Sequence, residues 1–163
     1  MEGASVPSAS QQPIRVLLVD DDPVFRELLA FVLRSDLGAE IVGAAGDGAK
    51  GVELAEALRP DVVVMDLRMP CMDGFEATRS IVSSVEGASV LVVSSSTDPM
   101  DVERAMDAGA VGYVPKELAV AELSAEVERL RPTERAPSRD SQLSISRATR
   151  TGLELFRRRF ALS

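Results

Sequence analysis

Side chains that could bind a cation or a phosphoryl group follow four separate apolar runs of this sequence. The runs and the side chains at their ends are 14–20 with Asp20 and Asp21, 61–66 with Asp66, 89–94 with Ser94, and 112–115 with Lys116. Two carboxylates about 4 Å apart repel each other by roughly 4 kcal/mol at an effective dielectric near 20. If the fold gathers the three acids, one lysine cannot neutralise them, and a bound cation is expected.

The chemistry of these side chains indicates which cation and which reaction to expect. An all-oxygen site with few protein ligands and room for water suits Mg²⁺, with Mn²⁺ as the alternative. The cation and Lys116 would also neutralise a phosphoryl group, and the hydroxyl of Ser94 could donate a hydrogen bond to it. Phosphoryl transfer is catalysed mainly by positioning and charge stabilisation, so little more is needed.

The apolar runs alternate with longer segments of helical periodicity. We expect strands over 14–20, 40–45, 61–66, 89–94 and 112–115, and helices over 23–35, 49–59, 75–84, 99–108 and 117–131. Near-continuous aliphatic strands that alternate with amphipathic helices indicate an α/β fold with a parallel sheet buried on both faces. Right-handed crossovers then predict a doubly wound five-stranded sheet in strand order 2-1-3-4-5. Such sheets carry their sites at the carboxyl ends of the strands, where the reactive side chains stand.

The helix predicted over 23–35 has clear local signals. Pro23 suits the first turn of a helix, and the residue before it, Asp22, is a typical N-cap. Three apolar residues, Val24, Leu28 and Phe31, fall on one helical face together with Val32. This spacing is the pattern of an amphipathic helix.

Composition limits the classes of function. The chain has 163 residues and a net charge of −8, which argues against a dominant electrostatic grip on nucleic acid. It has no histidine and one cysteine, so a disulfide within the chain and a cysteine-based zinc site are excluded. The first residues lack a secretory signal, and no apolar run is as long as a membrane span. A cytoplasmic location is the expectation.

Four regions are expected along the chain: a disordered leader over 1–12, a globular domain over 13–131, a polar linker over 132–142 and a basic amphipathic tail over 143–163. In the tail, five arginines stand against one glutamate, and Leu153, Phe156 and Phe160 fall on one helical stripe. Three interpretations of the tail remain open. It is a disordered tail, a helix that docks on a partner or on the acidic domain, or a remnant of a DNA-binding output domain.

Four segments resemble the signature segments of response-regulator receiver domains of two-component signal transduction. They are VLLVDDDPVFRELL, VVVMDLRMPCMDGFEATR, VLVVSSS and MDAGAVGYVPK, in the family's order within residues 14–131. The resemblance implies the flavodoxin-like receiver fold. It also implies that Asp66 accepts a phosphoryl group, with Mg²⁺, from a sensor histidine kinase or a small phosphodonor. Such a domain catalyses only its own phosphorylation and dephosphorylation and is not otherwise an enzyme.

The resemblance further implies a role for each matching position. The roles are Asp66 as phosphoacceptor and metal ligand, Asp21 as direct metal ligand, Asp20 as ligand through water, the backbone carbonyl of Arg68 as metal ligand, Lys116 as the phosphate-pairing lysine, Ser94 as phosphate-stabilising and switch hydroxyl, Tyr113 as switch aromatic, and Ser95 as the small residue that gives access to the aspartate. Pro70 and Gly74 match the turn after the third strand. The chain departs from many relatives at Pro115 and Glu117, which flank the lysine. Because proline lacks the N–H of a strand ladder, strand five is expected to end early or lie at the sheet edge.

Phosphorylation of Asp66 is expected to draw Ser94 inward, so that Tyr113 turns into the vacated space. The face made by the fourth helix, fifth strand and fifth helix would then repack. Expected partners are the kinase and, through this face, a second copy of the chain or a downstream target; nucleic acid is not expected. Two alternatives stay open. A haloacid-dehalogenase-type phosphotransferase needs a second acid where Arg68 stands, and a phosphorylation-independent scaffold would lack affinity for Mg²⁺.

Overall fold

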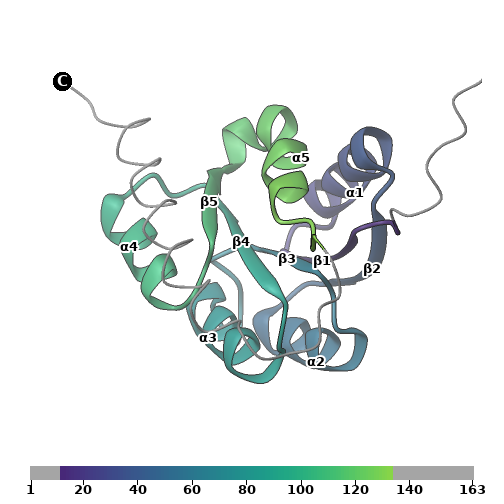
Figure 1. Ribbon diagram of the computed structural model, residues 1–163. Coiled ribbons are helices and arrows are strands. Elements are labelled where there is room, and N and C mark those ends of the chain that lie inside the picture. Colours follow the sequence, from purple (N-terminus) through teal and green to yellow (C-terminus); the bar gives the residue numbers. More distant parts are fainter. Residues whose placement is uncertain (1–11, 134–163) are drawn as a thin grey trace, which may run out of the picture.

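The computed structural model describes residues 12–133, which form five strands, five α-helices and one short 3₁₀ helix (Figure 1). The strands are β1 (Arg15–Val19), β2 (Glu40–Ala45), β3 (Val62–Met65), β4 (Ser89–Ser94) and β5 (Gly112–Pro115). The helices are α1 (Pro23–Leu37), α2 (Gly48–Leu58), α3 (Gly74–Ser84), α4 (Pro99–Asp107), η1 (Lys116–Leu118) and α5 (Ala119–Arg129). Every strand and helix expected from the sequence is present.

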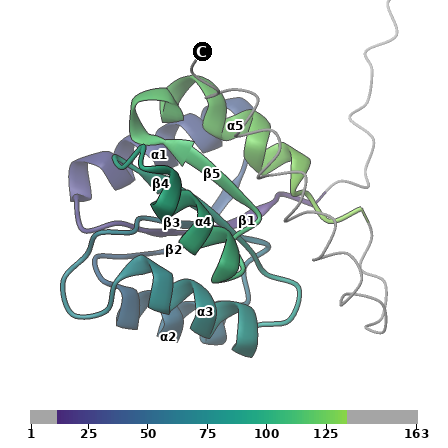
Figure 2. The same ribbon diagram turned by 90° about the vertical axis from the view of Figure 1, so that its left-hand side faces the viewer.

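The five strands form one parallel sheet in the order β2-β1-β3-β4-β5, which confirms the predicted topology. Figures 1 and 2 show helices on both faces, with α1 and α5 on one face and α2 and α3 on the other. The central strand β3 is buried at all four of its residues, Val62–Met65. A strand covered on both faces must be apolar throughout, which explains its run of three valines.

The core is divided by the sheet. On one face Leu29 and Leu33 of α1 and Leu123 of α5 pack against β1 and β3. On the other face Ala55 of α2 and Ile81 of α3 pack against the same strands. A smaller cluster lies under α4. It contains Leu67, Phe75, Val92, Val102, Ala105, Met106 and Ala110, with Tyr113 packed against it.

The buried face of α1 is not the face that the apolar spacing suggested. Val24 and Phe31 are 77% and 68% exposed, and Leu28 is also exposed. The helix buries Leu29 and Leu33 instead, and of the four residues on the predicted face only Val32 is buried. Both sides of this helix carry apolar side chains at helical spacing, so periodicity alone could not choose between them. The N-terminus is as predicted, because the side chain of the N-cap residue accepts hydrogen bonds from two backbone N–H groups of the first turn.

The end of β5 differs from the expectation in one detail. Pro115 is the last residue of β5, which is an edge strand, and it pairs in register with Ser94, so the expected place of this strand at the sheet edge is confirmed. The helix expected from residue 117 begins instead as the 3₁₀ turn η1, and α5 starts at Ala119. Lys116 therefore stands at a tight corner between the strand and the helix.

Residues 1–11 and 134–163 lie outside the described residues, so the predictions for the leader, most of the linker and the tail are not tested. Within residues 12–133, no helix combines the length and the apolar character that crossing a membrane requires.

Candidate functional site

Three carboxylates meet at the carboxyl edge of the sheet. Asp20 follows β1 and Asp66 follows β3, and these neighbouring strands end in register because Val19 pairs with Met65. Each of the two acids is only 4% exposed, whereas Asp21 is exposed. One oxygen from each acid lies within 4.8 Å of the others. The predicted gathering of the acids is therefore present.

Lys116 lies between the two buried acids. Its Nζ is 2.8 Å from Oδ2 of Asp20 and 3.2 Å from Oδ2 of Asp66. The ring of Phe25 lies beneath the ammonium, with 4.8 Å from Nζ to the ring centroid. The corner at the end of β5 thus directs the lysine from the edge strand to the acids near the sheet centre. The proline and glutamate that flank it do not displace it from the site.

The pKa shifts in the cluster follow from burial and from these charges. Burial raises the pKa of Asp66, and the negative charge of Asp20 raises it further. The charge and hydrogen bond of Lys116 act in the opposite direction without cancelling the rise. Burial alone would lower the pKa of Lys116, but the hydrogen bond to Asp20 and the charges of both acids raise it instead. At this edge of the sheet, three carboxylates thus share a single ammonium.

The geometry of the three acids suits a small divalent cation. Mg²⁺ takes oxygen ligands at about 2.1 Å, so two oxygens on opposite sides of the ion are about 4.2 Å apart. The 4.8 Å limit on the oxygens of Asp20, Asp21 and Asp66 is close to that span. Because Asp21 is exposed, the open side of the cluster leaves room for water ligands.

The loop after β3 approaches the site backbone closely. Gly74, the first residue of α3, donates its N–H to the carbonyl of Leu67 at 2.9 Å. A Cβ at position 74 would lie 2.0 Å from the carbonyl oxygen of Asp66, so no other residue fits without a shift of the backbone. The backbone N–H of Arg68 donates to the carboxylate of Asp66, which lowers the pKa of that acid. The loop thus fixes the orientation of Asp66 by backbone contacts.

The hydroxyl side chains predicted for the site belong to β4, to the loop that follows it and to β5. Ser94 is fully buried at the end of β4, and its Oγ accepts the N–H of Ser96 at 3.2 Å. The hydroxyl of Tyr113 donates to the carbonyl of Ser96 at 2.6 Å and also hydrogen-bonds with Ser94. Burial raises the pKa of Tyr113. Ser95 is exposed, and its side chain is small. Tyr113 is thus already joined to the loop that carries Ser94.

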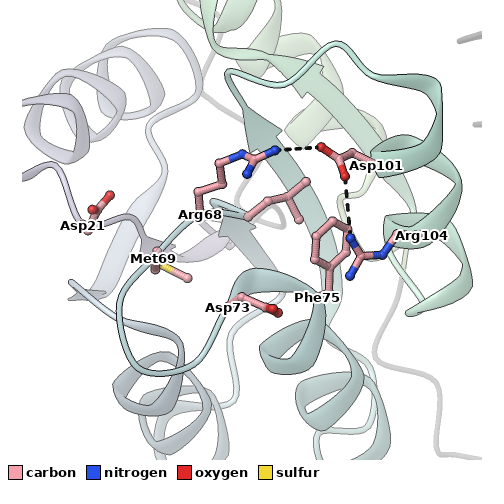
Figure 3. A pocket seen from close by; sticks show the side chains of 8 residues that line it. Asp21, Arg68, Met69, Asp73, Phe75, Asp101 and Arg104 are labelled. Atoms are coloured by element: carbon pink, nitrogen blue, oxygen red, sulfur yellow. Dashed lines mark hydrogen bonds and ion pairs between the residues drawn. The ribbon is translucent and has the colours of Figure 1, made fainter.

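One cluster at the site was not identified in the sequence. Asp101, in the first turn of α4, accepts hydrogen bonds from Ser96 at 2.6 Å and from Arg68 at 3.3 Å. It lines a pocket of about 380 Å³ beside the loop after β3, shown in Figure 3. The pocket is lined by Asp21, Leu67, Arg68, Met69, Asp73, Phe75, Asp101 and Arg104. An acid in a first helical turn is common without any site role, so the sequence held no signal for it.

Comparison with known proteins agrees with this geometry. Residues 16–128 match the family model of the response regulator receiver domain. The chain is 41% identical over 128 residues to the transcriptional regulatory protein PdtaR of Mycobacterium tuberculosis, a match that covers 78% of this chain and 62% of that protein. The chain therefore spans less than two thirds of the length of this relative.

Two solved structures show the same fold. The receiver domain of the response regulator NarL from Mycobacterium tuberculosis superposes with a TM-score of 0.71 at 33% identity, covering 76% of this chain and 100% of that one. The complex of CheX with CheY, BeF₃ and Mg²⁺ from Borrelia burgdorferi gives a TM-score of 0.68 at 28% identity, covering 72% of this chain and 89% of that one. With its sheet order, its strand-end acids and its family match, this chain belongs to the response regulator receiver domain family.

Proposed function

We propose that this chain accepts a phosphoryl group onto Asp66 in a reaction that depends on Mg²⁺. The observation that carries the proposal is the cluster in which Asp20, Asp21 and Asp66 gather around one ammonium, that of Lys116. Three acids with a single paired cation retain net negative charge in a largely buried place. A divalent cation held by these acids would relieve that repulsion and would supply positive charge for a phosphoryl group on Asp66.

Each residue has a distinct part in this proposal. Asp21 and Asp66 would hold Mg²⁺, with the backbone carbonyl of Arg68, and Asp20 would contribute through water. When bound, Mg²⁺ supplies positive charge to the transferred phosphoryl oxygens. Lys116, already 3.2 Å from Asp66, supplies the second positive charge. Ser94 donates its hydroxyl to a phosphoryl oxygen. The exposed Ser95 leaves the phosphodonor a path to Asp66.

The proposed output is a change of the face made by α4, β5 and α5. When Ser94 turns toward the phosphoryl group, its present hydrogen bonds with Ser96 and Tyr113 must change. These two residues connect to α4 and β5, so the change reaches that face. A phosphorylated chain would use it to bind a second copy of itself or a downstream target.

The proposed phosphodonor is a sensor histidine kinase, as membership of the receiver family implies, and a cytoplasmic place of action belongs to the same proposal. The chain would act catalytically only on its own phosphorylation and dephosphorylation. The haloacid-dehalogenase-type alternative is not favoured. Its second acid is replaced by Arg68, whose side chain is 73% exposed and pairs with Asp101. A scaffold that needs no phosphorylation would not require the buried acids around Lys116.

The test uses beryllofluoride, a mimic of the phosphoryl group. Adding it with Mg²⁺ to the ¹⁵N-labelled chain should shift the amide resonances of Ser94 and Tyr113, and omission of Mg²⁺ should abolish the shifts. The matched control is Asp66→Ala, which keeps the backbone and lacks the acceptor. If Asp66→Ala responds as strongly as the parent chain, the assignment of the acceptor is wrong.

A further inference from the structure

Asp101 is a buried acid outside the phosphoacceptor cluster. Among residues 12–133 it is the one carboxylate other than Asp20 and Asp66 that is classed as buried, with 9% exposure. Its Oδ2 accepts the hydroxyl of Ser96 and the guanidinium of Arg68 at the same time. A single carboxylate oxygen on α4 therefore contacts both the loop after β3 and the loop after β4. Figure 3 shows the contact of Asp101 with Arg68.

Both partners of Asp101 also contact the proposed site. Arg68 is two residues beyond Asp66, and its backbone N–H donates to the Asp66 carboxylate. Ser96 donates its N–H to Ser94 and accepts the hydroxyl of Tyr113. A change at the phosphoacceptor can therefore reach the first turn of α4 by two short routes that end at the same carboxylate.

The route through Arg68 is the one that phosphorylation can break. Its Nη2 lies 3.3 Å from Oδ2 of Asp101, and its side chain is 73% exposed, so this ion pair is weak. The Arg68 side chain lies in the wall of the pocket that also contains Asp21. A phosphoryl group on Asp66 carries about two negative charges and oxygens that a guanidinium binds in a bidentate manner. A singly charged carboxylate competes poorly with such a partner.

We propose that the Arg68–Asp101 pair is a latch on α4 that phosphorylation of Asp66 opens. In the unphosphorylated chain Asp101 holds Arg68 and, with it, the first turn of α4 against the loop after β3. The phosphoryl group draws the guanidinium away, so α4 loses one of its ties to the sheet edge. Asp101 is a positioning residue in this scheme, because it acts through Arg68. The inference rests on the proposed phosphorylation of Asp66.

The matched control is Arg104. Its Nη1 lies 3.8 Å from Oδ1 of the same carboxylate, and its guanidinium lies over the ring of Phe75, 4.0 Å from the centroid. Because Arg104 belongs to α4 itself, its contact with Asp101 joins α4 to no other segment, and its contact with Phe75 joins α4 to α3 but not to Arg68. An arginine that contacts Asp101 without bridging to the loop after β3 separates the latch from a general effect of charge.

The experiment measures hydrogen–deuterium exchange of the first amides of α4 in the full chain, with and without beryllofluoride and Mg²⁺. In the parent chain the ligand should accelerate exchange of α4 by up to about fivefold, the range that loss of one exposed ion pair allows. Arg68→Gln and Asp101→Asn should show this faster exchange without ligand and little further change with it. Arg104→Gln keeps the Arg68–Asp101 pair, so its α4 should still exchange faster when the ligand is added, as in the parent.

Two results would overturn the latch, and they can be told apart from failure of the proposed function. If residues 66–69 respond to beryllofluoride but α4 of Arg68→Gln exchanges like the parent in both states, the latch is refuted and the phosphoacceptor stands. The latch is also refuted if Arg104→Gln abolishes the response of α4 to beryllofluoride as Arg68→Gln does. If residues 66–69 of the parent do not respond to beryllofluoride at all, the proposed function fails, and the latch fails with its premise.

Discussion

Replacing Lys116 with methionine should make the stability of the fold depend on Mg²⁺. Methionine keeps an unbranched side chain of similar length and removes the one ammonium that contacts both Asp20 and Asp66. The two acids would then face each other without a paired cation while their side chains remain 5% exposed. A divalent cation bound by the same acids would restore the missing charge.

The size of the effect follows from the two distances. The ammonium of Lys116 lies 2.8 Å from Asp20 and 3.2 Å from Asp66. For these distances, Coulomb's law gives attractions of about 1.5 and 1.3 kcal/mol in bulk water, and about four times as much at an effective dielectric of 20. The loss is capped, because an acid can take up a proton instead. For an acid of ordinary pKa 3.8 this costs about 4 kcal/mol at pH 7, and less for Asp66, whose pKa is raised. We therefore expect Lys116→Met to lower the free energy of unfolding by about 3 kcal/mol.

The assay is urea unfolding followed by circular dichroism at pH 7, with a chelator and with Mg²⁺. Mg²⁺ at one hundred times its dissociation constant adds about 2.7 kcal/mol to a folded state that binds it, so it should recover most of the loss. The deficit should shrink as the pH falls, because the folded variant takes up protons on its acids more readily than the unfolded chain does.

The chain's other lysine provides the control. Lys50 pairs with Glu53 at 3.0 Å, and its side chain is 49% exposed, so Lys50→Met should differ from the parent in stability by no more than about 0.5 kcal/mol, and this difference should be the same with and without Mg²⁺. The reasoning about the acid cluster is refuted if Lys116→Met is as stable as Lys50→Met in the chelator. It is equally refuted if Mg²⁺ stabilises the two variants by the same amount.

Two further predictions concern the loop after β3 and Tyr113. Gly74→Ala should lower the free energy of unfolding by at least about 2 kcal/mol in urea, because its Cβ would lie 2.0 Å from the Asp66 carbonyl oxygen. Gly46→Ala, whose Cβ would have 3.5 Å of clearance, is the matched control and should change little. Because burial raises the pKa of Tyr113 above 10.0, stability should fall as the pH rises from about 10 through the raised pKa. The chain has a single tyrosine, so its absorbance reports this titration directly, and a midpoint at or below 10.0 would contradict the burial argument.

The sequence predicted the sheet and the acid cluster because both follow from strong local rules. Three consecutive valines before Asp66 can fill only a strand that is covered on both faces, and β3 is such a strand. Parallel strands all end at one edge, so the order of strands was enough to bring Asp20 and Lys116 to Asp66. No knowledge of side-chain contacts was needed for this part.

The parts that the sequence missed depend on choices that local rules leave open. Helix α1 has two sets of apolar residues at helical spacing: one contains Val24 and Phe31, and the other contains Leu29 and Leu33. Only packing against α5 and the sheet decides which set is buried. The contact between Arg68 and Asp101 joins residues 33 positions apart through two loops. Loop conformation sets that contact, and the loop sequences carry no periodicity from which to derive it.

The most direct test of the central claim is the mass of the intact chain after incubation with acetyl phosphate and Mg²⁺. The proposed chemistry predicts that the parent chain gains the mass of one phosphoryl group, that a chelator prevents the gain, and that Asp66→Ala gains nothing. Equal phosphorylation of Asp66→Ala, or a parent chain that stays unmodified with Mg²⁺ and excess phosphodonor present, would contradict it.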